Sequence, residues 1–179
     1  MKNSKNKHKL TLAVIDIDGT IANHPIGLFP IKVKNKIQCR GCQFFKRGGC
    51  YRATWCDQAD KSQIQNYFSE NKVLRLTVNE EAFSIVHNLA KNPDTKIVYV
   101  SARGPSLLKV TKRWLRHHNF PSGQVFCVGS DADPTDDKVD CVDNLVRENK
   151  PTAILFLEDD PVIGAKYEKI FNAKNILRV

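Results

Sequence analysis

Residues 10–20 read LTLAVIDIDGT, and this stretch decides the fold. All of the first six residues except Thr11 are apolar, which predicts a buried strand that ends where the acidic residues begin. Side chains alternate along a strand, so Asp16 and Asp18 share a face if the extended backbone continues. Two carboxylates this close repel each other, and proteins normally keep such a pair where a cation or a reaction needs it. The stretch therefore predicts a site for one divalent ion.

Gly19 and Thr20 complete this stretch. Glycine allows a sharp turn and lets a bulky ligand approach the backbone closely, so both residues are candidate substrate contacts. The alternative is a strand followed by an ordinary turn, since Asp and Gly are common turn residues. The residues that follow the other strands decide between the two interpretations.

Strand and helix patterns alternate regularly over residues 79–179. Strands are predicted at 96–100, 124–128, 153–157 and 176–179, and helices begin near Asn79, Pro105, Thr135 or Asp136, and Val162. This alternation predicts an α/β fold of the Rossmann-like type, with a parallel sheet of about five strands and helices on both faces. Ligands bind such sheets at the carboxyl ends of the strands.

Polar or charged side chains also lie in the next three strand-to-helix segments. Ser101 and Arg103 follow one strand, Lys138 lies at the start of the third predicted helix after an acidic stretch, and Glu158 and Asp159 follow the strand at 153–157. Taken alone, Ser101 is explained as a turn residue and Lys138 as a solvated helix residue. Chance accounts for one or two such positions, but four strand ends that converge on one edge indicate a common site. The set favours the functional interpretation of the first stretch.

The chemistry that this set fits is phosphoryl transfer, in which a protein mainly positions groups and neutralises charge. Asp16 is the candidate nucleophile, because a carboxylate can form an aspartyl-phosphate and divide one difficult step into two. Asp18 is the candidate general acid and base. Ser101 offers a hydroxyl to a phosphate oxygen, and Lys138 adds a fixed positive charge.

Clustered carboxylates beside a dianionic substrate need a compensating cation, and oxygen ligands suit Mg²⁺. The predicted ligands are Asp16, the backbone carbonyl of Asp18, and an acid from the strand at 153–157. That acid is either Glu158 or Asp159, with Asp159 favoured.

The run of residues 16–20, DIDGT, resembles the first motif of the haloacid dehalogenase (HAD) superfamily, and the later strand ends follow the order of its other motifs. The SAR run at 101–103 and the EDD run at 158–160 are most similar to the phosphatase domain of polynucleotide kinase-phosphatases. The resemblance implies a HAD-like catalytic core at 10–20 and 79–179, and a substrate contact for Arg103. It departs at Pro134, where the family has an acid four residues before Lys138, with Asp133 and Asp136 as imperfect substitutes.

Four cysteines fall within residues 21–78, in the spacing C-x₂-C-x₇-C-x₅-C, at Cys39, Cys42, Cys50 and Cys56. Four thiolates predict a closed, structural Zn²⁺ site that stabilises a segment with few apolar residues. An Fe–S cluster has the same ligands and remains an alternative, as do unligated cysteines. The segment is thus predicted to be a metal-binding insertion at the position of the superfamily's cap.

The formal net charge of +9 lies outside the predicted core. Residues 1–9 form a basic arm with four lysines, and residues 21–78 carry ten Lys and Arg against three acids. The fourteen basic and fourteen acidic residues of 79–179 cancel. This asymmetry indicates a polyanionic partner, with a phosphorylated nucleotide or nucleic acid as the leading candidate, although a basic surface also serves solubility alone.

The apolar runs of the sequence are short. None reaches the ~18 consecutive residues of a membrane span, and the run before Asp16 is too short for a secretory signal. We therefore expect a cytoplasmic protein with no membrane segment, whose six cysteines stay reduced.

The sequence as a whole predicts a Mg²⁺-dependent phosphatase of the HAD type that acts on a nucleic-acid 3′-phosphate or a nucleotide. One alternative is a phosphatase of small phosphoesters, which a closing cap would favour. The other is a nucleic-acid-binding module with an inactive HAD-like core.

Overall fold

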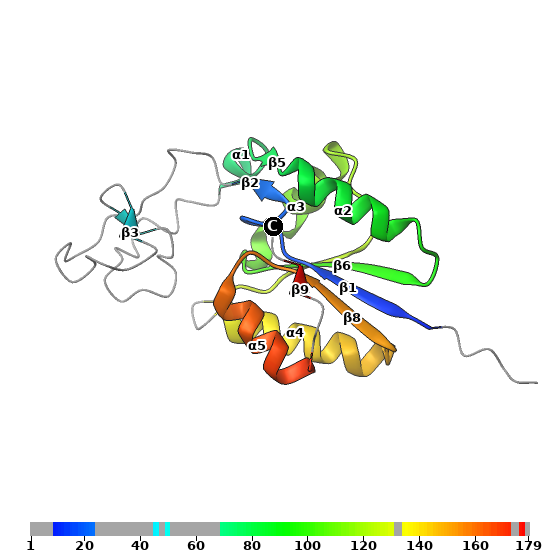
Figure 1. The fold of residues 1–179 in the computed structure, drawn as a ribbon. Helices are drawn as coiled ribbons and strands as arrows, with labels where there is room; N and C mark the ends of the chain where they lie inside the picture. Colours follow the sequence, from blue (N-terminus) through cyan, green and yellow to red (C-terminus); the bar gives the residue numbers. More distant parts are fainter. Residues whose placement is uncertain are drawn as a thin grey trace, which may run out of the picture.

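A computed structural model describes residues 9–23, 45–46, 49–50, 69–130, 134–172 and 176–177. Five strands form one parallel sheet in the order β7-β6-β1-β8-β9, with β1 at its centre (Figure 1). Their bounds are β1 Thr11–Ile15, β6 Thr95–Ser101, β7 Gln124–Cys127, β8 Ala153–Leu157 and β9 Ile176–Leu177. The predicted α/β fold with a five-stranded parallel sheet is confirmed.

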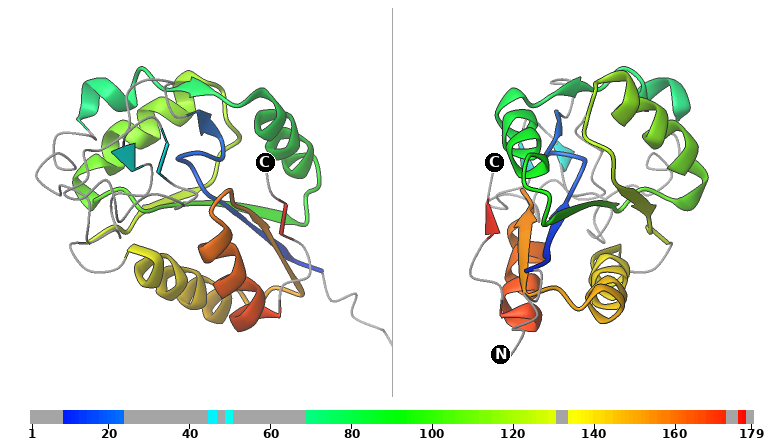
Figure 2. Two further views of the ribbon diagram at one scale, coloured as in Figure 1. Left: turned by 60° about the vertical axis from the view of Figure 1, so that its left-hand side comes forward. Right: turned by 90° about the vertical axis from the view of Figure 1, so that its right-hand side faces the viewer.

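Helices cover both faces of this sheet (Figure 2). One layer contains α1, α2, the 3₁₀ turn η2 and α3, and the other contains α4 and α5. Their bounds are α1 Glu70–Val73, α2 Glu80–Ala90, η2 Pro105–Leu107, α3 Leu108–His117, α4 Pro134–Asn149 and α5 Pro161–Phe171. None of the helices in the described ranges combines the length and the apolar composition that crossing a bilayer needs.

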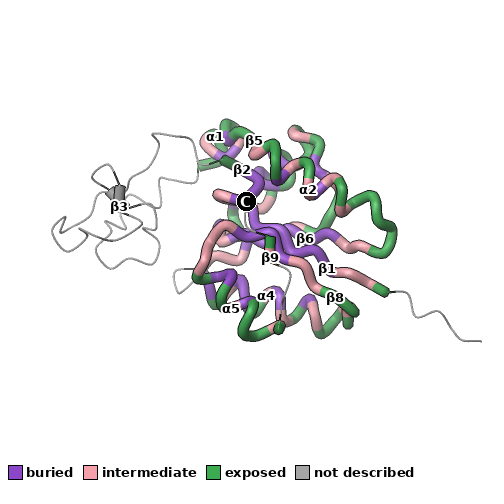
Figure 3. Tube along the Cα trace, viewed as in Figure 1, coloured by how far each residue is buried: buried purple, intermediate pink, exposed green. Residues whose placement is uncertain are grey.

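The alternating side chains of β1 join the two layers to the sheet. Ala13 and Ile15 pack in a core cluster with residues of α2 and α3, whereas Leu12 and Val14 pack in a second cluster with residues of α4 and α5. Figure 3 shows the central strands buried between helices whose outer surfaces are exposed. This two-sided burial explains why the strand contains almost no polar residue before Asp16.

Asn79 and Asp160 cap their helices, and α4 begins one residue before the earlier of its two predicted starts. Asn79 accepts a hydrogen bond from the backbone N–H of Ala82, and Asp160 caps α5 by accepting from the first turn of that helix. Helix α4 begins at Pro134, so Thr135 and Asp136 lie inside its first turn instead of capping it. Proline is favoured at the first helical position because its fixed φ suits the helix and its missing N–H is not needed there.

Both ends of the stretch 21–78 pack into the core cluster beside α2 and α3. Ile21, Ala22, Val73 and Leu76 are buried there. Strand β2 (Ala22–Asn23) pairs antiparallel with β5 (Thr77–Val78), and β3 (Phe45–Lys46) pairs with β4 (Gly49–Cys50). The predicted division into an arm at 1–9, a core and an insertion stays a prediction.

Trp114 links α3 to the end of this stretch. Its ring is fully buried, and its Nε1–H donates to the backbone carbonyl of Leu76 at 2.9 Å. Trp114→Phe keeps an aromatic side chain in the core but removes that donor, so we expect a loss of about 1–3 kcal/mol in the free energy of unfolding. Urea unfolding measures the loss.

Arg113→Ala is the matched control, because Arg113 is exposed on the same helix and its removal should change stability by less than about 0.5 kcal/mol. Equal unfolding midpoints for the two variants would contradict the structural role of the indole N–H.

Candidate active site

The predicted site residues meet at the carboxyl edge of the sheet, around its central strand. Asp16 follows β1 directly, and its backbone N–H donates to Leu157 at the end of β8. In this strand order the connections reverse direction on either side of β1, and ligands of open α/β sheets bind at such a switch point. Sheet topology thus places the first motif where a ligand site is expected.

Lys138 is the buried cation of the site. Its Nζ donates to Oδ1 of Asp16 at 2.7 Å and to Oε2 of Glu158 at 2.7 Å. Burial acts to lower the pKa of Lys138, but the carboxylates of Asp16 and Glu158 outweigh this effect and hold the pKa well above its ordinary value. The ammonium is therefore a permanent positive charge between two acids that belong to different strand ends.

Asp16, Glu158 and Asp159 form the group of acids in the described part of the chain that can hold a metal ion. One oxygen from each lies within 4.8 Å of the others. The hydroxyl of Thr20 lies 3.0 Å from Oδ2 of Asp16 and 2.8 Å from Oδ1 of Asp159, so it holds the two carboxylates together. Three carboxylates from one sheet edge fit the oxygen coordination that Mg²⁺ prefers.

The two acids after β8 lie in different surroundings. Glu158 is buried, its Oε1 accepts from the backbone N–H of Asp160, and its Oε2 accepts from Lys138. Burial raises the pKa of Glu158, and the ammonium of Lys138 opposes part of that rise. Asp159 is half-buried and lies against Gly19 and Thr20.

Asp18 points to the opposite side of the strand end, toward β6. Its Oδ1 accepts from Nη2 of Arg103 at 2.7 Å, and its Oδ2 accepts from Nε of Arg103 at 2.8 Å and from Oγ of Ser101 at 3.2 Å. Asp18, Ser101 and Arg103 therefore form a second group beside the acidic group. The side chain of Asp18 is not among the three clustered acids.

The guanidinium of Arg103 is buried and forms hydrogen bonds within the protein. Its side chain is 0% exposed, and its Nη1 donates to Oγ1 of Thr111 on α3 at 2.9 Å. Together with the two bonds to Asp18, this contact fixes the guanidinium in one orientation. In this structure Arg103 orients Asp18, and a contact of Arg103 with substrate stays a prediction.

Sequence reasoning missed Gly129, which follows β7. A methyl group at this position would lie 1.9 Å from the carbonyl oxygen of Ala102, and the Gly129 N–H donates to the carbonyl of Arg103. Only glycine lets the two loops approach this closely and so fixes the segment that holds Ser101 and Arg103. A glycine directly after a predicted strand at the ligand edge was the available signal.

Of the two substitutes considered for the missing acid of the third motif, the structure describes Asp136 alone. Asp136 is exposed and pairs with Lys166 of α5, and Asp133 lies outside the described residues. The next acid, Asp137, accepts from the backbone N–H and the hydroxyl of Ser130. The loop before α4 is thus tied to the helix by Asp137.

The predicted four-cysteine site falls mostly outside the described residues. This applies to Cys39, Cys42 and Cys56, while Cys50 is described only as the backbone end of β4. The prediction of Zn²⁺ or an Fe–S cluster at these cysteines stays a prediction.

A family model described as the PITM 1-3, LNS2 domain matches residues 60–155. Among solved structures, the chain is similar to one in the "Pnkp1/Rnl/Hen1 complex", with 12% identity and a TM-score of 0.55. It is also similar to one in the "Pnkp1/Rnl/Hen1 RNA repair complex", with 12% identity and a TM-score of 0.57. Both matches cover 100% of this chain but 51% and 47% of those chains, so it spans about half of their length.

The HAD domain of effector protein Lem4 from Legionella pneumophila is similar at 18% identity, with a TM-score of 0.46, over 95% of this chain and 85% of that chain. No curated protein matches the chain.

The parallel sheet, with an acidic cluster and a buried lysine at its carboxyl edge, defines a protein with a HAD-like fold. The family model covers more than half of the 179 residues. The chain therefore belongs to the PITM 1-3, LNS2 domain family. The likeness to the chains of the two Pnkp1/Rnl/Hen1 complexes, at 12% identity, shows the fold alone.

Gly19 leaves the space that Asp159 occupies. A methyl group at residue 19 would lie 2.3 Å from Oδ2 of Asp159, and the backbone there has a φ of +94°. Gly19→Ala should therefore displace the Asp159 carboxylate and weaken Mg²⁺ binding by about 10–100-fold. Isothermal titration with Mg²⁺ measures the change.

Gly104→Ala is the matched control at the same edge of the sheet, because the nearest atom to its added methyl group is 3.8 Å away. If both variants bind Mg²⁺ as tightly as the natural chain, Asp159 is not a ligand.

Proposed function

We propose that this chain is a Mg²⁺-dependent phosphatase that releases phosphate from a nucleic-acid 3′-phosphate or a nucleotide, through an aspartyl-phosphate on Asp16. The observation that carries the proposal is the contact of Asp16 with the ammonium of Lys138 at 2.7 Å, beside two further carboxylates at a sheet switch point. Membership of a HAD-like family supports the reaction class.

In the first step a carboxylate oxygen of Asp16 attacks phosphorus, and the bond from phosphorus to the leaving oxygen breaks. Lys138 holds Asp16 in place and offsets the negative charge that the substrate brings to the buried edge. Glu158 in turn fixes Lys138 from the other side. Thr20 orients the second oxygen of Asp16.

Asp16 and Asp159 would hold the Mg²⁺, together with the backbone carbonyl of Asp18. When bound, the ion supplies Lewis-acid stabilisation of the phosphoryl oxygens. We assign the direct contact to Asp159 and not to Glu158, because Glu158 is buried and held by Lys138 and Asp160, whereas Asp159 is half-buried and shares the hydroxyl of Thr20 with Asp16.

Asp18 would donate a proton to the leaving oxygen and then take one from the water that attacks the aspartyl-phosphate. This second step breaks the bond between Asp16 and phosphorus and releases inorganic phosphate. Arg103 and Ser101 are positioning residues in this scheme, since they fix the carboxylate through three hydrogen bonds.

The expected reaction is tested by the release of inorganic phosphate from a 3′-phosphorylated oligonucleotide, nucleoside monophosphates and an aryl phosphate. Asp16→Asn should lower kcat at least about 10³-fold because it removes the nucleophile, and Asp18→Asn should lower it about 10²–10⁴-fold. Asp136→Asn is the control, since Asp136 is an exposed acid paired with Lys166. Removal of Mg²⁺ with a chelator should abolish release.

The substrate profile separates the proposal from its rivals. Preference for the aryl phosphate over the oligonucleotide and the nucleoside monophosphates would indicate a phosphatase of small phosphoesters. Tight oligonucleotide binding without release from any substrate would indicate a binding module with an inactive core.

We also propose structural Zn²⁺ at Cys39, Cys42, Cys50 and Cys56, on the spacing of these residues. Elemental analysis of the purified chain should find about one zinc per molecule, and replacing Cys39 and Cys42 with Ser should remove it. Iron with sulfide in place of zinc would indicate a cluster.

A further inference from the structure

Helix α3 presents an outward face that is entirely basic. Lys109, Lys112, Arg113 and Arg116 are all exposed, and the helix contains no acidic residue. Within the described part of the chain, none of the ion pairs involves these four side chains. We call these four residues the basic stripe.

The spacing of the stripe follows from the helix. Positions i, i+3, i+4 and i+7 lie on one side of a helix, so the four cations line up along one face. The opposite face packs into the core through Val110, Thr111, Trp114 and Leu115. The stripe extends about 10 Å along the helix axis, which is the rise of about three nucleotides in one strand of a duplex.

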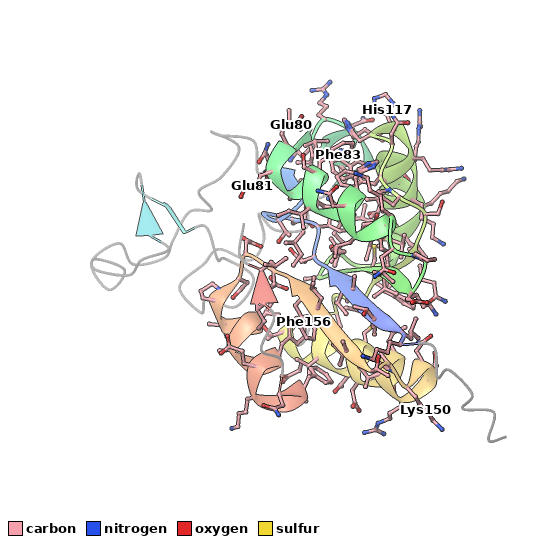
Figure 4. The ribbon with its side chains drawn as sticks, turned by 45° about the vertical axis from the view of Figure 1, so that its right-hand side comes forward. Glu80, Glu81, Phe83, His117, Lys150 and Phe156 are labelled. Atoms are coloured by element: carbon pink, nitrogen blue, oxygen red, sulfur yellow. The ribbon has the colours of Figure 1, made fainter. Side chains whose placement is uncertain are left out.

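The sum of charges over residues 79–179 does not reveal this stripe, because acids elsewhere in the segment cancel its cations. Positive side chains gather on α3, whereas residues 134–172, which include α4, β8 and α5, contain nine acids against five Lys and Arg. Figure 4 shows His117, at the end of α3, on the same side of the sheet as Glu80 and Phe83, with Lys150 on the other side. A chain segment that is neutral in sum therefore still presents four exposed cations on one helix.

Two exposed acids of the described residues lie on helices beside α3. Burial and His117 lower the pKa of His118, and Glu80 acts in the opposite direction, which places Glu80 near the carboxyl end of α3. Glu70 is exposed on α1, which packs against α3. The stripe itself contains four cations and no acid.

The stripe begins beside the candidate active site. Thr111, which binds Arg103 at 2.9 Å, lies in sequence between Lys109 and Lys112. Arg103 in turn holds Asp18. A polyanion lying along α3 would thus reach the carboxyl edge of the sheet at its first turn.

We propose that the basic stripe binds the phosphate backbone of a nucleic-acid strand whose phosphorylated end enters the active site. The inference rests on the proposed phosphatase function and specifies a polymeric substrate for it. A lipid surface fits less well, because interfacial helices turn apolar side chains outward. The exposed large apolar residues of the described chain are Val162, Ile170 and Leu177, none of them on α3.

The test replaces Lys112, Arg113 and Arg116 with alanine, in the natural chain and in the Asp16→Asn chain. The matched control replaces Arg147, Lys166 and Lys169 with alanine. These changes remove the same amount of positive charge from α4 and α5 in the opposite layer. Urea unfolding checks that both triple variants remain folded.

In the Asp16→Asn chain, the stripe variant should bind a single-stranded oligonucleotide at least about ten-fold more weakly than the control variant. The slope of log Kd against log salt should fall by about 2, because each lost phosphate contact to a single strand removes about 0.7. In the active chain, kcat/KM should fall for the 3′-phosphorylated oligonucleotide and stay within about two-fold for the aryl phosphate.

Equal oligonucleotide affinity and salt slope for the two triple variants would overturn the proposal. So would a stripe variant that loses binding to phosphatidylserine vesicles but keeps its oligonucleotide affinity. Absence of phosphatase activity on every substrate would reject the proposed function alone, since oligonucleotide binding is measured separately from turnover.

Discussion

The ammonium of Lys138 is the interaction on which the site depends. Three carboxylates at a buried sheet edge repel one another, and bringing them together requires positive charge. Lys138 contacts two of them directly, Asp16 and Glu158, at 2.7 Å each. One ammonium against three carboxylates leaves a net negative charge, which a divalent cation would balance. The buried lysine and a bound Mg²⁺ would thus complement each other, since neither alone neutralises the group.

The fold is what lets one lysine reach both acids. Strand β1 lies between β6 and β8, so the residues after β1 and β8 are neighbours, although Asp16 and Glu158 are 142 positions apart in the sequence. Helix α4 packs on one face of these strands through Val139 and Val142, and this packing brings Lys138 to the same edge. The acidic group also requires Gly19, because the absence of a side chain there leaves the space that Asp159 occupies. Core packing on one side and backbone geometry on the other therefore fix the acidic group.

Much of this arrangement could be predicted from the sequence because it depends on local periodicity. Buried strands are continuous apolar runs, and the residues directly after them share one edge, which identified Asp16 and Asp159, while Lys138 was identified at the start of the helix that follows the next strand. The partner of Arg103 could not be predicted. Arg103 lies in the loop after β6 and contacts Asp18 after β1, and the position of that loop depends on Gly129, which follows β7. The basic stripe on α3 was also missed. A charge sum over residues 79–179 cancels side chains that the fold places on opposite sides of the sheet.

Asp16 and Asp18 lie two residues apart, yet the fold gives them different partners. Ile17 between them is fully buried and anchors the turn in the core. Asp16 faces β8 and α4, where an ammonium and two acids favour metal and phosphate chemistry. Asp18 faces β6, where Arg103 and Ser101 hold it through three hydrogen bonds. Two identical side chains in unlike surroundings are the arrangement expected when one acts as nucleophile and the other transfers protons.

Because Arg103 also binds Thr111 on α3, the group that orients Asp18 is continuous with the helix that carries the basic stripe. A nucleic-acid strand bound along α3 would therefore lie against the elements that position Asp18, the proposed proton-transfer residue.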